Sequence, residues 1–171
     1  EVTAKASKSY LPANNEKLRP RTIASVAQTK VERLATGIRE FDRVLGGGVV
    51  PGSLVLLGGT PGIGKSTILL DAGLRFGQQG IKVLYVSGEE SEEQTAMRAV
   101  RLGGAQSNDN LLILTATDLD AILAQANALK PQLLIIDSIQ TMYNPELQTA
   151  AGSVGQEREC TAKMLQFAKS T

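Results

Sequence analysis

The chain has 171 residues, of which 42% are hydrophobic and 20% are charged, and its formal net charge is +1. These values are typical of an ordinary globular protein with room for one well-packed domain but not comfortably for two. The charge balance alone predicts no nucleic-acid partner. Histidine is absent and Cys160 is the only cysteine. This excludes an internal disulfide, catalytic triads that use histidine, and metal sites built from histidine or several cysteines.

Targeting signals are not evident in the sequence. No apolar run approaches the roughly eighteen residues of a membrane span, and the first residues, Glu-Val-Thr-Ala-Lys, do not resemble a signal peptide. A single cysteine fits a reducing compartment, so we expect a cytoplasmic protein with no membrane partner. The absence of an initial Met indicates an excerpt of a longer chain.

Residues 1–33 predict a linker or extended arm. They mix Lys, Ser, Asn, Pro and Ala with few large apolar side chains, so we expect little regular structure there. The arm is basic, and a nucleic-acid contact is therefore an alternative to a solvated linker, although no set of aromatic side chains accompanies the charges. The core is expected to cover residues 34–171.

Residues 59–66, Gly-Thr-Pro-Gly-Ile-Gly-Lys-Ser, match the phosphate-loop pattern G-x-x-x-x-G-K-[ST] without a mismatch. An apolar run at 53–57 predicts a buried parallel strand before the loop, and residues 67–79 predict a helix after it. The glycines of such a loop let backbone N–H groups point at phosphate oxygens, and the helix N-terminus adds positive charge. The alternative, a glycine-rich turn before a helix, leaves the Lys-Ser pair and the upstream strand unexplained.

The loop supplies most of the candidate nucleotide-binding residues, which are Gly59, Thr60, Pro61, Gly62, Ile63, Gly64, Lys65, Ser66 and Thr67. Lys65 is expected to reach the β and γ phosphates, and Ser66 to supply a hydroxyl ligand for Mg²⁺. Thr67 is expected to cap or pack in the first helical turn.

The rest of the core predicts alternating strands and helices, which is typical of an α/β fold with a mainly parallel sheet. Short apolar runs predict strands at 82–86, 111–114 and 131–138. Amphipathic periodicity predicts helices at 36–45, about 92–102, 118–129, and from 153 or 154 to about 168. A polar loop is expected at 143–155.

Acidic residues follow two of these strands, at the edge where ligands bind in open parallel sheets. Asp137 ends the last strand and matches the Asp that holds a Mg²⁺-bound water in phosphate-loop enzymes, with a simple helix-capping role as the alternative. Glu89 and Glu90 follow the strand after the loop. Because histidine is absent, a Glu is the available base for an attacking water, so both are candidate catalytic residues with Lys65. The alternative is that these acids only cap the next helix.

Together these motifs resemble the RecA-type ATPase superfamily and, within it, the bacterial RadA (Sms) family of DNA repair and recombination proteins. The residues that carry the resemblance are 34–38, 41–42, 45–48, 59–67, 85–91, 137–141, 152–156 and 158–160. The resemblance covers about residues 36–171, and the motifs taken together are far more specific than the phosphate loop alone. The resemblance implies a three-layer RecA-type phosphate-loop NTPase core.

The resemblance also implies an activity. Proteins of this kind are hexameric, DNA-stimulated ATPases that bind ATP or ADP with Mg²⁺, move along single-stranded DNA and extend recombination intermediates by branch migration. The implied partners are single-stranded or branched DNA, other copies of the chain in a hexamer, and a RecA-type recombinase as a candidate. Two alternatives stay open: a DnaB-like replicative helicase motor, and a KaiC-like ATPase or kinase with a protein partner.

Individual roles follow from the same resemblance. Glu89 is similar in position to the catalytic Glu of RecA and of DnaB-type helicases, and Glu90 is its alternative because KaiC has a Glu pair at this place. Arg98 falls where RecA stacks a Tyr on adenine, and a guanidinium plane could do the same.

The loop at 142–155 is similar in position to the first DNA-binding loop of RecA. It has no Lys or Arg before Arg158, so its DNA contacts would have to come from backbone N–H groups and from Asn144, Gln148 and Ser153. We therefore expect weak DNA binding by this loop alone.

The sequence departs from the RadA family in what it lacks. The family begins with a four-cysteine zinc module, so with one cysteine no zinc is expected here. The family continues into another core strand, a second DNA loop, a Lys-Asn-Arg-Phe-Gly motif that reaches a neighbour's nucleotide, and a Lon-protease-like domain. The additional strand lies between the loop strand and the Asp137 strand in RecA-type sheets. We expect a sheet that lacks its C-terminal strands, and weak turnover in isolation.

Overall fold

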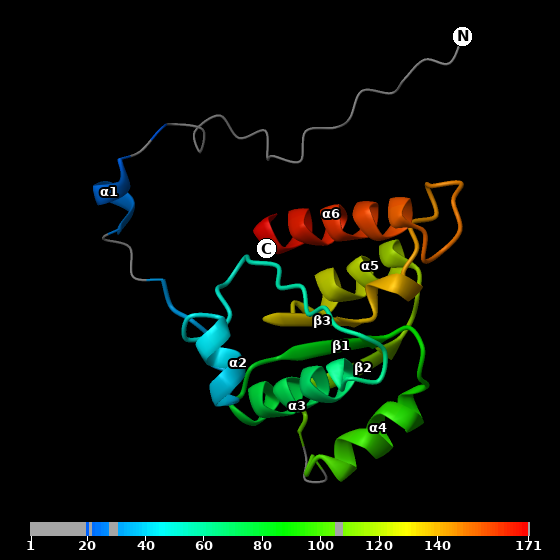
Figure 1. The fold of residues 1–171 in the computed structure, drawn as a ribbon, viewed down its shortest axis with the longest axis horizontal. Helices are drawn as coiled ribbons and strands as arrows, with labels where there is room; N and C mark the ends of the chain where they lie inside the picture. The colour runs from blue at the N-terminus through cyan, green and yellow to red at the C-terminus, as the bar shows by residue number, and fades with distance from the viewer. Residues whose placement is uncertain (1–19, 21, 28–30, 105–107, 171) are drawn as a thin grey trace.

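A computed structural model describes residues 20, 22–27, 31–104 and 108–170 of the chain. Its centre is a parallel sheet with the strand order β2-β1-β3 (Figure 1). The strands are β1 (Val83–Ser87), β2 (Leu111–Thr115) and β3 (Leu133–Asp137). The α/β class with a parallel sheet is therefore confirmed, and these strands lie where the apolar runs predicted them.

Helices cover both faces of the sheet, which gives the three layers visible in Figure 1. On one side lie α3 (Lys65–Gln78) and α4 (Glu92–Arg101), and on the other α5 (Leu119–Leu129) and α6 (Val154–Ser170). The remaining helices are α1 (Ile23–Ala27), α2 (Arg39–Val44) and the 3₁₀ helix η2 (Ile139–Thr141). In the part of the chain that is described, no helix has the length and apolar character needed to cross a membrane.

The central strand β1 supplies side chains to two separate hydrophobic cores, and all five of its residues are buried. Successive side chains of a strand point to opposite faces of the sheet. Val83 and Tyr85 pack with the buried face of α3, whereas Leu84 and Val86 pack with α5 and α6. A strand covered on both faces needs a nearly continuous apolar sequence, and this explains why the run at 82–86 was recognisable.

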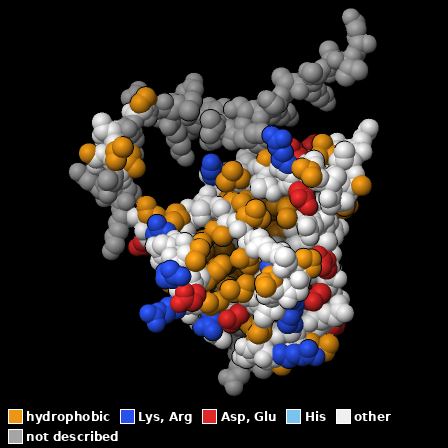
Figure 2. Space-filling model, in the orientation of Figure 1, with side chains coloured by type: hydrophobic (Ala, Val, Ile, Leu, Met, Phe, Trp, Pro, Cys, Tyr) orange, Lys and Arg blue, Asp and Glu red, His pale blue; other side chains and the backbone are white. Residues whose placement is uncertain are grey.

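Residues 53–57 do not form a strand, so the prediction of a strand before the phosphate loop is wrong for this structure. Leu54, Val55 and Leu56 are 36%, 45% and 74% exposed rather than buried. A strand needs a neighbour to pair its backbone groups, and among the described strands β3 pairs with β1 alone. Hydrophobic side chains consequently gather in the middle of the face over β1, β3 and this segment (Figure 2).

The chain before the phosphate loop is held by local polar contacts. Within the predicted arm, residues 23–27 form the short helix α1, while the other arm residues up to 30, apart from 20 and 22, lie outside the described residues. The Asp42 carboxylate accepts hydrogen bonds from the backbone N–H groups of Thr36 and Gly37, at 2.7 and 3.0 Å. Gly48 has φ +133°, and a Cβ there would lie 2.6 Å from the carbonyl carbon of Leu34. Glycine is therefore required where the chain leaves α2.

The side chain of a buried glutamine forms hydrogen bonds that hold the loop between η2 and α6 in place. Gln156 is 1% exposed. Its side-chain oxygen accepts a hydrogen bond from the Asn144 N–H at 2.7 Å, and its amide nitrogen donates to the carbonyls of Asn144 and Thr149 at 3.3 and 2.9 Å. Lys163 Nζ donates to Asn144 Oδ1 and to Glu146 Oε2, each at 3.1 Å. Helix α6 thus satisfies buried polar groups of the loop.

Replacing this glutamine should destabilise the protein. Gln156→Ala is expected to lower the free energy of unfolding by about 1–3 kcal/mol, because it leaves the buried Asn144 N–H without its partner and removes the hydrogen bond to the Thr149 carbonyl. Gln148→Ala, an exposed glutamine of the same loop, serves as the control and should change it by less than about 0.5 kcal/mol. Urea unfolding followed by circular dichroism measures the change in the free energy of unfolding for both variants. An equally small change for the two variants would show that Gln156 does not stabilise the loop.

Candidate functional site

The phosphate-loop motif lies directly before α3. Gly62 and Gly64 adopt φ values of +78° and +100°, a left-handed conformation that favours glycine. Gly64 immediately precedes Lys65, the first residue of the 14-residue helix. The first N–H groups of a helix have no partner within the helix, and the helix dipole makes this end positive. The predicted motif therefore occupies a place suited to an anion.

The Lys65 ammonium lies against the loop. Its Nζ donates hydrogen bonds to the carbonyl oxygens of Gly59 and Thr60, each at 2.9 Å. The other predicted loop residues are largely exposed, including Ile63 at 69%. A phosphate bound by the loop would therefore meet a positive charge that is already held beside it.

Ser66 and Asp137 come together although 71 positions separate them in the sequence. The Ser66 Oγ donates a hydrogen bond to Asp137 Oδ1 at 2.9 Å. Ser66 is in the first turn of α3 and Asp137 is the last residue of β3, so they meet at the carboxyl end of the sheet. This is the edge at which parallel sheets bind ligands.

Tyr85 also contacts Asp137. Its hydroxyl donates a hydrogen bond to Asp137 Oδ2 at 2.5 Å, and its side chain is fully buried. Burial raises the pKa of Tyr85 far above its ordinary value, and the hydrogen bond to Asp137 raises this pKa further. The phenol therefore keeps its proton at neutral pH and acts as the donor.

The Ser66 hydroxyl and the Asp137 carboxylate fit a Mg²⁺ ion that takes few ligands from the protein. Mg²⁺ prefers oxygen ligands and usually keeps several waters, binding through one or two protein groups and the phosphates of a substrate. Among the residues that the structure describes, no group of three or more His, Cys, Asp and Glu side chains could hold a metal. The two oxygen donors, Ser66 and Asp137, suit an ion that arrives with a polyphosphate.

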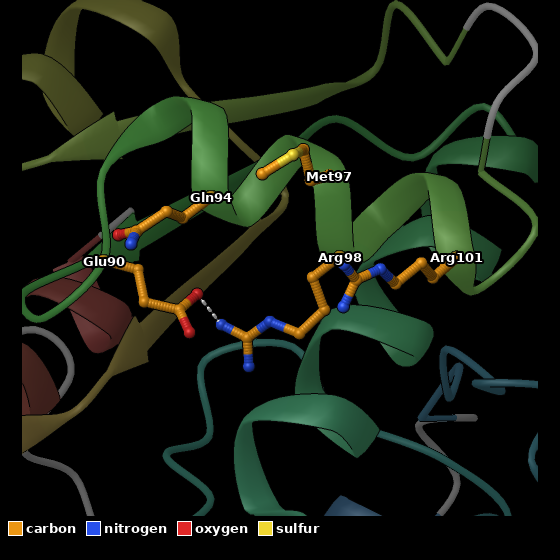
Figure 3. A pocket seen from close by; sticks show the side chains of 5 residues that line it. All are labelled: Glu90, Gln94, Met97, Arg98 and Arg101. Atoms are coloured by element: carbon orange, nitrogen blue, oxygen red, sulfur yellow. Dashed lines mark hydrogen bonds and ion pairs between the residues drawn. The ribbon is translucent and has the colours of Figure 1, made fainter.

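In the turn after β1, the side chains of Glu89 and Glu90 contact different partners. Glu89 is exposed, and its Oε1 accepts a hydrogen bond from the Ser138 hydroxyl at 3.1 Å. Glu90 forms an ion pair with Arg98 of α4 (Figure 3). The Ser87 hydroxyl fixes the turn, since it accepts a hydrogen bond from the Glu90 N–H at 2.9 Å and donates to the Glu90 carbonyl at 2.8 Å. Only Glu89 is thus directed toward the end of β3.

Gly88 allows this turn to pack closely on η2. A Cβ at Gly88 would overlap the Thr141 Oγ1 and would lie 2.8 Å from the Thr141 Cβ. The Gly88 N–H donates to the Asp137 carbonyl at 2.9 Å, which continues the pairing of β1 with β3. The residue before Glu89 therefore has no room for a side chain, and this fixes the Glu89 backbone beside Asp137.

Arg98 lines a shallow hollow along α4. The hollow is lined by Glu90, Gln94, Met97, Arg98 and Arg101 (Figure 3). The Arg98 side chain is 22% exposed and reaches across to Glu90. Within the described residues no hydrogen bond or ion pair joins it to residues 59–67. Its contact with adenine stays a prediction.

Tyr85 is the site residue that the sequence analysis missed. A phenol in a buried strand must find a hydrogen-bond partner, and this requirement was the available signal. The partner itself depends on how the strands align. Because Ser87 pairs with Asp137 in the register of β1 and β3, the carboxylate lies within reach of a side chain two residues earlier on β1.

The predicted DNA contact of Asn144 is wrong in this arrangement. Asn144 is 1% exposed, and its Oδ1 accepts hydrogen bonds from the Glu146 N–H and from Lys163 Nζ. Ser153 is partly buried, and its Oγ accepts a hydrogen bond from the Gln156 N–H at 3.3 Å. Of the three side chains named for this loop, Gln148 is the exposed one.

Known proteins resemble this chain over most of its length. A family model described as an AAA domain matches residues 19–171. The DNA repair protein RadA of Halalkalibacterium halodurans is 48% identical over 171 residues, which are 100% of this chain and 37% of that relative. The proteins of the same name from Streptococcus pneumoniae and Escherichia coli are 47% and 49% identical, over 98% and 86% of this chain and 39% and 32% of their own lengths. The chain thus spans about a third of the length of these relatives.

These similarities agree with the motifs that carried the resemblance, and they do not favour the helicase-motor or clock-ATPase alternatives. The family model covers nearly the whole chain, including the phosphate loop, Asp137 and the Glu pair. The chain therefore belongs to the AAA domain family and, within the RecA superfamily, is of the RadA type.

Proposed function

We propose that this chain is the ATP-binding and ATP-hydrolysing core of a RadA-like DNA repair protein. The observation that carries the proposal is the contact of Ser66 with Asp137 at 2.9 Å, directly after the phosphate loop. These residues belong to the two motifs that share one Mg²⁺ ion in phosphate-loop enzymes. The relatives named DNA repair protein RadA support the role in repair.

In this proposal the phosphate loop binds the triphosphate. Backbone N–H groups of the loop and the N-terminus of α3 would bind phosphate oxygens. Lys65 would exchange its contacts with the Gly59 and Thr60 carbonyls for oxygens of the β and γ phosphates. Ser66 would ligate Mg²⁺ and Asp137 would hold one of its waters, while the ion neutralises charge on the phosphates.

The geometry favours Glu89 over Glu90 as the base. In hydrolysis the oxygen of a water molecule bonds to the γ phosphorus while the bond from that phosphorus to the bridging oxygen breaks, and a base accepts the proton of the water. Glu89 is exposed beside the end of β3 and can accept that proton. The Glu90 carboxylate is already paired with the Arg98 guanidinium, which makes it a weaker proton acceptor than the exposed Glu89.

Action on DNA and assembly into a hexamer are part of the proposal and rest on the likeness to RadA. Residues 142–157 contain no Lys or Arg, so this loop alone is expected to bind DNA weakly. ATPases of this class complete each site with an Arg or Lys from a neighbouring subunit, so efficient turnover is expected to require assembly. Arg98 stays the candidate for the adenine contact.

Removing the Lys65 ammonium should weaken nucleotide binding. Lys65→Ala is expected to lower the affinity for ATP by at least about tenfold, because the charge beside the β and γ phosphates is lost. Lys169→Ala removes an exposed lysine near the end of α6 and should leave the affinity unchanged. Titration with a fluorescent ATP analogue measures both variants, and normal binding by Lys65→Ala would refute the assigned role.

The two acids of the turn should differ in their effects on turnover. Glu89→Gln is expected to lower the hydrolysis rate by about 10²- to 10⁴-fold while nucleotide binding is retained, since only proton acceptance is removed. Glu90→Gln is the matched control and should lower the rate by less than about tenfold. Phosphate release by the full-length protein measures both. A larger loss for Glu90→Gln would reverse the assignment.

The DNA-directed role predicts that single-stranded DNA increases the ATPase rate of the full-length protein. Hydrolysis is measured with and without DNA, with Lys65→Ala as the inactive control. A rate that does not respond to DNA would favour a protein partner instead. Preference for branched over unbranched DNA would separate branch migration from a replicative helicase role.

A further inference from the structure

Tyr85 lies outside the phosphate loop, yet its hydroxyl reaches the carboxylate of the proposed metal site. Its ring is 0% exposed and belongs to the hydrophobic core on the α3 side of the sheet, which also contains Leu70, Phe76 and Ile135. The hydroxyl is 2.5 Å from Asp137 Oδ2. The side chain thus connects the most buried part of the sheet to the edge at which the site lies.

The two carboxylate oxygens of Asp137 have different partners. Oδ1 accepts the hydrogen bond from Ser66 at 2.9 Å, and Oδ2 accepts the one from Tyr85. No other side chain within the described residues donates to this carboxylate. The terminal torsion of Asp is broad, so one hydrogen bond leaves the carboxylate free to turn. A second bond from a fixed phenol determines which oxygen faces Ser66.

The Tyr85 hydroxyl is itself held firmly in place. Tyr85 is in the middle of the central strand, where it pairs with Ile113 of β2 on one side and Ile135 of β3 on the other. Close packing around the ring leaves it no other position, because buried aromatic side chains occupy defined rotamers. Ser66, in contrast, is only partly buried and lies in the first turn of its helix. The fixed partner of Asp137 is therefore the tyrosine.

We propose that Tyr85 is a positioning residue for the Mg²⁺ site, which holds Oδ2 of Asp137 so that Oδ1 stays directed at Ser66 and available to a metal-bound water. The inference rests on the proposed function and deepens it. Tyr85 touches neither nucleotide nor metal and acts through Asp137. Groups that orient a ligating or water-binding carboxylate typically change metal affinity by about 10- to 100-fold when they are removed.

A purely structural explanation of the same contact is that Asp137 only accepts the hydrogen bond that the buried Tyr85 hydroxyl needs. The two explanations differ in one measurable respect. A hydroxyl that only supports the fold affects binding of nucleotide equally with and without Mg²⁺. A hydroxyl that orients Asp137 affects binding only when Mg²⁺ is present.

The test is Tyr85→Phe in the full-length protein, which removes the hydroxyl and keeps the ring that fills the core. Binding of a fluorescent ATP analogue is titrated in Mg²⁺ and in EDTA. The Mg²⁺ concentration for half-maximal binding is expected to rise about tenfold, while the affinity in EDTA is unchanged. Tyr143→Phe is the matched control: that hydroxyl is 3.5 Å from Asp118 Oδ2 at the start of α5 rather than beside Asp137, and its removal should change neither titration.

Asp137→Asn separates this inference from the proposed function. If Asp137→Asn changes the Mg²⁺ dependence and Tyr85→Phe does not, the positioning role is overturned and the proposed function stands. An equal loss for Tyr85→Phe in Mg²⁺ and EDTA also overturns it. If Asp137→Asn leaves the Mg²⁺ dependence unchanged, the metal role in the proposed function fails as well.

Discussion

The hydrogen bond between Ser66 and Asp137 joins the two halves of the site, and the rest of the fold determines whether it can form. Helix α3 packs on all three strands, with Leu70, Leu74 and Phe76 buried against the sheet. This packing places the first turn of α3 at the carboxyl end of β3. Hydrophobic burial therefore supplies the stability, and the polar contact lies at its edge, where the metal site is proposed.

The turn that follows the central strand β1 places two acidic side chains near this contact. The same turn carries Glu89 and Glu90, identical side chains in adjacent positions, but the Ser87 hydroxyl and the close approach at Gly88 give them different surroundings. One carboxylate is left exposed beside the end of β3, and the other is neutralised by Arg98. The backbone of the turn thus gives two identical side chains different surroundings.

Features that depend on a local sequence pattern could be predicted from the sequence. Features that depend on pairing between distant parts of the chain could not. The runs at 82–86, 111–114 and 131–138 identified three strands, and the loop motif and Asp137 were named as two segments that the structure brings together. The similar run at 53–57 failed because a strand also requires a neighbour. The contact of Tyr85 with Asp137 depends on strand register, and the burial of Asn144 depends on Gln156, so neither was visible in local composition.

A crystal structure of the full-length protein with Mg²⁺ and a non-hydrolysable ATP analogue tests the central claim most directly. The account predicts the triphosphate on the backbone N–H groups of the phosphate loop, with Mg²⁺ on the Ser66 Oγ and one of its waters on Asp137. A triphosphate bound elsewhere, or a loop-bound triphosphate with Ser66 and Asp137 apart and no metal between them, would contradict it.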